Sequence, residues 1–207
     1  LLRCMFLQSK PRARGDRPTV KLHLCGEPHA GKTVLGQALE RATWYFGSAY
    51  DAESVKDDPT PETRTLTKEK PLVFDGNKSV RVIDYAGQPA FHLMHHHSLS
   101  GARGLYVVAV PLRGISRGGD LHDHCRGLTV GVLRWLRMIS AARRGRGAKV
   151  DVFLLGNIFA SKGDGKPVMD ADAANRMMQT VCSQVQIGMP GNIAIAASAV
   201  FDFRKNK

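Results

Sequence analysis

The sequence predicts an α/β fold, in which a mostly parallel sheet carries helices on both of its faces. Strand-like and helix-like segments alternate from residue 19 onward, and this alternation is typical of parallel sheets joined by crossover helices. A near-continuous apolar run at 104–110 has the composition of a strand buried on both faces. The length of 207 residues suits one domain.

The first half of the predicted domain holds a strand, a helix and a hairpin. Apolar residues alternate over 19–25, as in a strand, and recur at helical spacing from Thr33 to about Tyr45. The polar residues 47–64 are predicted to form a long loop. Asp75-Gly76-Asn77 is a hairpin signal, and the strands that it joins are residues 71–74 and 79–83.

The second half repeats the alternation of strand and helix. Apolar residues recur at helical spacing over 121–141 and again from Ala171 to about Val185, so both segments are predicted helices. Residues 150–155 form a predicted central strand, and residues 192–197 form the last one. A final helix should follow, and we expect this piece of chain to stop before it.

Residues 1–18 are predicted to be a basic linker or tail, and residues 19–207 the folded domain. The formal net charge is +12, and part of it is concentrated at 10–17 and 143–147. Few aromatic residues lie near these runs, so base stacking with nucleic acid has little support. Membrane contact would depend on the same two segments, which we interpret as solvated.

The composition favours an intracellular setting. Four cysteines are scattered along the chain without a paired motif, which suits a reducing compartment, and we therefore predict a cytoplasmic protein. No stretch approaches the roughly 18 apolar residues of a membrane span. The chain starts without an initiator methionine, so we expect it to be part of a longer protein.

Residues 26–33 match the pattern G-x-x-x-x-G-K-S/T in full, between a predicted strand and a predicted helix. In such a loop, backbone N–H groups and the helix N-terminus bind phosphate, and the lysine reaches the β- and γ-phosphates. Lys32 is the predicted phosphate-binding lysine, and the hydroxyl of Thr33 is a predicted Mg²⁺ ligand. Pro28 removes one amide donor. The predicted nucleotide contacts are Gly26, Glu27, Pro28, His29, Ala30, Gly31, Lys32, Thr33 and Val34.

A second motif, Asp84-Tyr85-Ala86-Gly87-Gln88, follows the predicted strand at 79–83. It resembles the D-x-x-G-Q segment that begins the second switch of Ras-like GTPases. This resemblance implies that Asp84 holds Mg²⁺ through water, that the Gly87 N–H contacts the γ-phosphate, and that Gln88 orients the attacking water. Gln88 and Lys32 are then the predicted catalytic residues. For the first switch we choose Thr63 as a Mg²⁺ ligand, and a solvated threonine-rich loop is an equal alternative.

The surroundings of the second motif resemble the Roc domain of Roco proteins, which is Ras-like and belongs to large multidomain chains. Residues 84–92, 95–99 and 104–108 carry this resemblance. It implies a P-loop NTPase fold of the Ras-like type, bound GTP or GDP with Mg²⁺, and contacts with other domains. A second copy of the chain, forming a homodimer, is a further candidate partner. The basic residues 1–18 would then be a linker.

Guanine recognition departs from the family pattern. Ras-like proteins place N/T-K-x-D after the fifth strand, where the aspartate binds the guanine edge. Asn157 fits this pattern, but Ile158 and Ala160 replace its lysine and aspartate. Residues 161–164 match the N/T-K-x-D pattern more closely, and their aspartate, Asp164, lies four residues beyond Ala160. Near the C-terminus, Ser198 and Ala199 resemble the start of the S-A-K loop that touches the base.

Two histidine-rich segments offer ligand types without a complete metal set. His92, His95 and His96 share one face of a helix, and we interpret them as switch-region surface residues or partner contacts, with metal binding as the minor alternative. Residues 122–125 also carry metal-ligand types, and their spacing favours a helix start.

Three functions remain open at this stage. The first is a switch with slow GTP hydrolysis, since no catalytic arginine is evident. The others are a nucleotide-binding scaffold with little turnover and another P-loop enzyme, such as an ATPase or a kinase.

Overall fold

The computed structural model describes residues 19–45, 67–74, 78–99, 104–114, 120–143, 149–158 and 169–202. Its strands are β1 (Thr19–Gly26), β2 (Thr67–Phe74), β3 (Lys78–Tyr85), β4 (Gly104–Leu112), β5 (Val150–Ile158) and β6 (Ile193–Asp202). Its helices are α2 (Lys32–Tyr45), the 3-10 helix η2 (Pro89–Phe91), α3 (His92–Leu99), α4 (Leu121–Ala142) and α5 (Ala171–Gly188).

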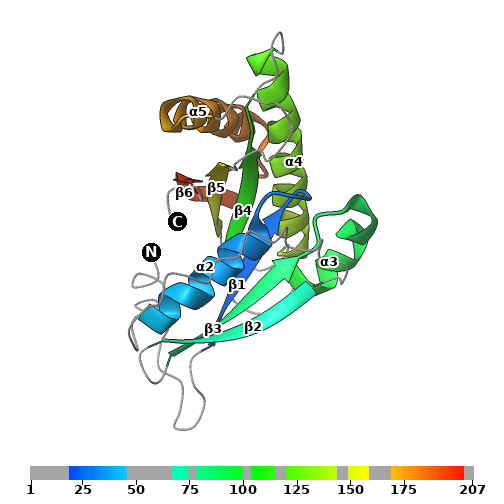
Figure 1. Ribbon diagram of the computed structural model, residues 1–207. Helices are drawn as coiled ribbons and strands as arrows, with labels where there is room; N and C mark the ends of the chain where they lie inside the picture. Colours follow the sequence, from blue (N-terminus) through cyan, green and yellow to red (C-terminus); the bar gives the residue numbers. More distant parts are fainter. Residues whose placement is uncertain are drawn as a thin grey trace.

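The six strands form one sheet in the order β2-β3-β1-β4-β5-β6. Only β2 runs antiparallel to its neighbour; the other pairs are parallel (Figure 1). The chain is therefore an α/β protein with a mostly parallel sheet. The antiparallel pairing of β2 with β3 confirms the predicted hairpin, whose turn at 75–77 lies outside the described residues.

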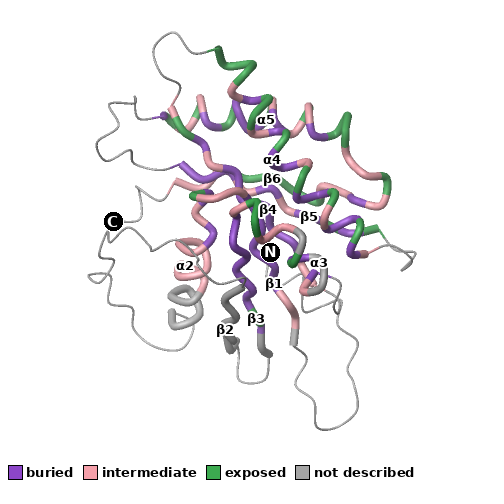
Figure 2. The backbone as a smooth tube through the Cα atoms, turned by 90° about the vertical axis from the view of Figure 1, so that its right-hand side faces the viewer, coloured by how far each residue is buried: buried purple, intermediate pink, exposed green. Residues whose placement is uncertain are grey.

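Two apolar cores lie on opposite faces of the sheet. On one face, α2 packs Leu35 and Leu39 against a small core that includes Leu22 and Leu24. On the other face, α4 and α5 cover a larger core that includes Trp135. The alternation of neighbouring strand residues between the two cores follows from the two-residue period of a strand. Strands β1, β3 and β4 are accordingly buried along much of their length (Figure 2).

The last strand is longer than the sequence predicts. The prediction ended it at residue 197, whereas β6 continues to Asp202 beside the full length of β5. A register shift at Val152/Phe153 inserts one extra residue, Ala196, into β6. The prediction stopped early because residues 196–199 are small and show no apolar alternation.

Both long helices begin at an aspartate. The Asp120 side chain accepts a hydrogen bond from the His122 N–H at 3.0 Å, and Asp170 accepts one from the Ala173 N–H at 2.6 Å. These are N-caps, which satisfy N–H groups that the first helical turn leaves without partners. No helix in the described ranges combines the length and the apolar character that crossing a membrane requires.

Candidate functional site

The loop that joins β1 to α2, which we call the phosphate loop (Gly26–Thr33), has an unusual backbone. Gly26, His29 and Gly31 have positive φ angles of 138°, 58° and 79°, a region that glycine enters readily and other residues rarely do. At Gly26 an added Cβ would lie 2.5 Å from the Ala109 oxygen. The two glycines of the motif are thus required by the curl of the loop and by its contact with β4.

Lys32 is folded back inside this loop. Its Nζ donates hydrogen bonds to the carbonyl oxygens of Gly26 at 3.0 Å and Glu27 at 2.8 Å. Burial lowers the pKa of Lys32, and the nearby negative charges of Asp84 and Glu27 partly oppose this effect. The ammonium group is therefore held within the curl by carbonyl acceptors.

Thr33 and Asp84 bring the two sequence motifs together. The Thr33 hydroxyl donates a 2.6 Å hydrogen bond to Asp84 Oδ2, and the Asp84 side chain is buried. Thr33 belongs to the first turn of α2, while Asp84 lies near the end of β3. Because β1 and β3 are parallel neighbours, their carboxyl ends meet at one edge of the sheet.

Gly87 brings the second motif directly against the phosphate loop. A Cβ added to Gly87 would collide with backbone atoms of Glu27 and Pro28. Only a glycine fits this approach, which explains the residue type at the fourth position of the motif. Gln88 is the next residue, immediately before η2.

Asn157 connects β5 to the phosphate loop. Its Nδ2 donates a hydrogen bond to the carbonyl oxygen of Ala30, and its side chain is fully buried. Asn157 therefore stabilises the backbone of the phosphate loop at Ala30. Val34 lies in the first turn of α2, beside the loop.

Ser198 and Ala199 are not in a loop, so that expectation from the sequence is wrong. Both lie inside β6, where they pair with Leu154 and Leu155 of β5. The pairing with β5 carries the strand past them. Thr63 and Asp164 lie outside the described residues.

An ion pair that no sequence pattern indicated joins the phosphate loop to α4. Arg134 Nη1 lies 3.3 Å from Glu27 Oε1. The Glu27 side chain also passes over Gly131, where an added Cβ would lie 2.8 Å from its Cγ. The two residues are 107 positions apart, so no local pattern could have revealed the contact.

The structure corrects the interpretation of the histidines after the second motif as surface residues. His95 is completely buried, and His92 is half-buried. His95 Nε2 lies 2.8 Å from the Ala86 oxygen, and His92 Nε2 lies 3.0 Å from the Gly87 oxygen. Their three-residue spacing on a helix directly after the motif was the available signal. The side chain of His96 is outside what the structure describes.

A further histidine, His23 of β1, is fully buried in the protein interior. Its ring stacks on Tyr106 with centroids 4.6 Å apart, and its Nδ1 is hydrogen-bonded to the Tyr85 hydroxyl at 2.9 Å. Burial, with smaller contributions from the charges of Lys21 and Arg143, lowers the pKa of His23 to about 4. Its ring is therefore neutral at pH 7.

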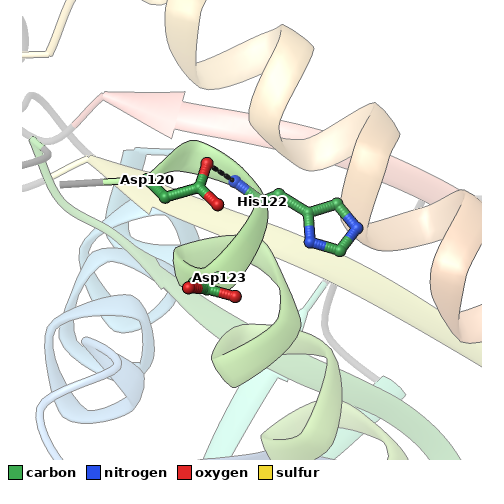
Figure 3. Close-up of side chains that lie close together, drawn as sticks. All are labelled: Asp120, His122 and Asp123. Atoms are coloured by element: carbon green, nitrogen blue, oxygen red, sulfur yellow. Dashed lines mark hydrogen bonds between the residues drawn. The ribbon is translucent and has the colours of Figure 1, made fainter.

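The start of α4 gathers Asp120, His122 and Asp123 (Figure 3). All three side chains are exposed, and Asp120 already caps the helix. This agrees with the interpretation of the segment as a helix start.

The residues at the phosphate loop suit a triphosphate with Mg²⁺. Thr33 and Asp84 present neighbouring hydroxyl and carboxylate oxygens, which are the donors that Mg²⁺ prefers. The first N–H groups of α2 have no partners within the helix and can bind an anion. Within the described part of the chain, the buried atoms Gln88 Oε1 and Asn157 Oδ1 also have no hydrogen-bond partner, so both can accept from a ligand.

No protein-family model matches the chain, and no curated protein matches it. Among solved structures, it is similar to one titled "The Structure of the Mammalian SRP Receptor", with a TM-score of 0.49 and 12% sequence identity. That similarity covers 88% of this chain and 89% of the other. The strand order and the loop geometry described above are those of a P-loop NTPase fold of the Ras-like type.

Proposed function

We propose that this chain is a GTP-binding domain that acts as a Mg²⁺-dependent switch and hydrolyses GTP slowly. The observation that carries the proposal is the hydrogen bond between Thr33 and Asp84 beside the phosphate loop, which joins the two motifs into one site. The resemblance to Roc domains further suggests a larger multidomain protein, in which other domains or a second copy would respond to the bound nucleotide.

The phosphate loop would bind the phosphates through its backbone N–H groups and through Lys32. The lysine would exchange its bonds to the Gly26 and Glu27 carbonyls for bonds to phosphate oxygens. Thr33 and Asp84 would hold Mg²⁺, with Thr63 as a further proposed ligand. When bound, Mg²⁺ would neutralise charge on the β- and γ-phosphates.

For hydrolysis, Gln88 would orient the attacking water. It is the residue after Gly87, which lies against the phosphate loop, so its amide can approach the terminal phosphate. We expect slow turnover, because the sequence identifies no arginine for stabilising charge in the transition state. A partner would then be the source of such a group.

Base selectivity would depend on Asn157 and Asp164. Asn157 is tied to Ala30 and retains a buried acceptor oxygen, while Asp164 would bind the guanine edge. Competition between GTP and ATP for the full chain tests this assignment. Stronger binding of ATP would overturn it.

The nucleotide site itself is tested with Lys32→Ala. Removal of the buried charge should weaken triphosphate binding by about tenfold or more. Lys149→Ala is the matched control, because Lys149 is exposed and should leave affinity unchanged. Equal affinities in Lys32→Ala and the unaltered protein would overturn the proposal.

A nucleotide-binding scaffold with little turnover is a second candidate, and Pro28, which lacks an N–H group in the cradle, favours it. Single-turnover hydrolysis separates the two functions. In a GTPase, Gln88→Leu should slow hydrolysis by about tenfold or more. Equal rates in both proteins would remove Gln88 from catalysis and favour the scaffold.

A further inference from the structure

The two α3 histidines bind consecutive carbonyl groups of the second motif. His95 Nε2 lies 2.8 Å from the Ala86 oxygen, and His92 Nε2 lies 3.0 Å from the Gly87 oxygen. A carbonyl oxygen only accepts hydrogen bonds, so each Nε2 carries a proton and donates it. The motif backbone is thus held on its α3 side by two side-chain donors.

These bonds determine how the peptide groups are turned. In a planar trans peptide, the C=O of one residue and the N–H of the next point in opposite directions, and the described residues include no cis peptide. His95 draws the Ala86 carbonyl toward α3, so the Gly87 N–H points away from α3. His92 has the same effect on the N–H of Gln88.

The His95 ring is itself held in place. It stacks on Trp135 with centroids 5.4 Å apart and an interplanar angle of 24°, and it meets Tyr85 edge-on at 5.0 Å. Burial lowers the pKa of His95, an effect that its bond to the Ala86 carbonyl partly opposes. A neutral, packed ring of one tautomer is a rigid donor.

Gly87 also lies directly against the phosphate loop. An added Cβ there would collide with backbone atoms of Glu27 and Pro28. The motif backbone at 86–87 therefore contacts both the loop and the histidine donors. A rotation of the Ala86–Gly87 peptide would break the bond to His95.

We propose that His95 is a positioning residue, which turns the Gly87 N–H toward the terminal phosphate of a bound nucleoside triphosphate, and that His92 supports it through the next peptide. Neither histidine touches the phosphate in this arrangement. The inference rests on the proposed function. It adds the side chain, His95, through which the site would bind a triphosphate more tightly than a diphosphate.

The test uses two variants of the full chain. His95→Phe keeps a ring of similar size and removes the donor, whereas His95→Gln keeps an amide N–H that can reach the Ala86 carbonyl. The measured quantity is the ratio of the GDP dissociation constant to that of a non-hydrolysable GTP analogue, with Mg²⁺ present. His95→Phe should lower this ratio by about tenfold while GDP affinity stays within about twofold, and His95→Gln should preserve the ratio.

The backbone amide of Gly87 gives a second measurement, which needs no nucleotide. In ¹H–¹⁵N spectra its resonance should shift in His95→Phe and return toward the original position in His95→Gln. If His95→Phe does not fold, the same ratio of dissociation constants is measured for His92→Phe and His95→Gln. His92→Phe should lower the ratio by less than about tenfold, and His95→Gln should preserve it.

The outcomes separate the two proposals. An unchanged ratio in His95→Phe, or an equal loss of GDP and triphosphate affinity, overturns the positioning role while the nucleotide site stands. A protein that binds neither nucleotide before any substitution overturns the proposed function and this inference with it.

Discussion

The hydroxyl group of Thr33 donates a 2.6 Å hydrogen bond to the carboxylate of Asp84. The two residues are 51 positions apart and belong to different elements, the start of α2 and the end of β3. A buried carboxylate that already accepts from a hydroxyl group is a strong pairing, because charged acceptors form the stronger hydrogen bonds. The contact joins the two motifs directly.

Asp84→Asn should make nucleotide binding nearly independent of Mg²⁺. The amide keeps an oxygen that Thr33 can donate to, but it lacks the negative charge that attracts the ion. We expect GTP affinity to fall by about tenfold or more with Mg²⁺ present and to change little in a chelator. Asp123→Asn, at an exposed carboxylate of α4, is the control. An equal loss in both conditions would contradict a role in holding Mg²⁺.

Gly26→Ala should destabilise the fold. The new Cβ would lie 2.5 Å from the Ala109 oxygen, and the φ of 138° is unfavourable for alanine. We expect a loss of about 2 kcal/mol or more in the free energy of unfolding, measured by denaturant titration.

Gly127→Ala is the matched control for that substitution. Gly127 lies within α4, and an added Cβ there meets no atom within 4 Å. Alanine is a better helix former than glycine, so this variant should gain about 0.5–1 kcal/mol. Similar losses in both variants would show that the contact with Ala109 does not set the cost.

His23 should make stability depend on pH in a defined window. Burial lowers its pKa from 6.5 to about 4, so the folded state resists a proton that the unfolded state binds. The contribution is therefore absent above pH 6.5 and becomes destabilising as the pH falls from 6.5 to 4. The expected loss across this window is about 3 kcal/mol.

The difference between the unaltered protein and His23→Phe isolates this effect from the carboxylates that titrate nearby. Urea titrations between pH 4 and pH 7 should show a shallower pH dependence in His23→Phe. His122→Gln, at an exposed ring on α4, should leave the dependence unchanged. Parallel curves for the unaltered protein and His23→Phe would rule out His23 as the source.

Asn157→Ala should loosen the phosphate loop. The substitution removes a buried donor to the Ala30 carbonyl and leaves that acceptor unpaired, at a cost of about 1–3 kcal/mol. Thermal or urea unfolding measures this loss, and hydrogen exchange at Ala30 and Gly31 should quicken. Asn175→Ala, at an exposed position of α5, should show neither effect.

The phosphate loop and the mostly parallel sheet with helices on both faces could be predicted, because both depend on local sequence patterns. Residues 26–33 carry their chemistry within eight consecutive positions, and the alternation of strand and helix limits the topology. The end of β6 could not be predicted, because pairing with β5 rather than its own side chains extends it past Ser198 and Ala199.

The supporting contacts of the site were beyond local reasoning. Asn157 meets Ala30 across 127 positions, and Arg134 meets Glu27 across 107. The burial of His95 likewise depends on Trp135, which α4 supplies from far along the chain. Helical spacing placed His92 and His95 on one face, but it could not show which neighbour covers that face.

The stacking of Trp135 on His95 gives the molecule an optical reporter of its own. Indole emission is sensitive to the rings packed around it, and this indole touches the residue that holds the Ala86 carbonyl. The chain has two tryptophans, so replacing Trp44 with Phe leaves Trp135 as the sole emitter. Rearrangement of residues 86–95 would then be visible in the fluorescence of an otherwise unlabelled protein.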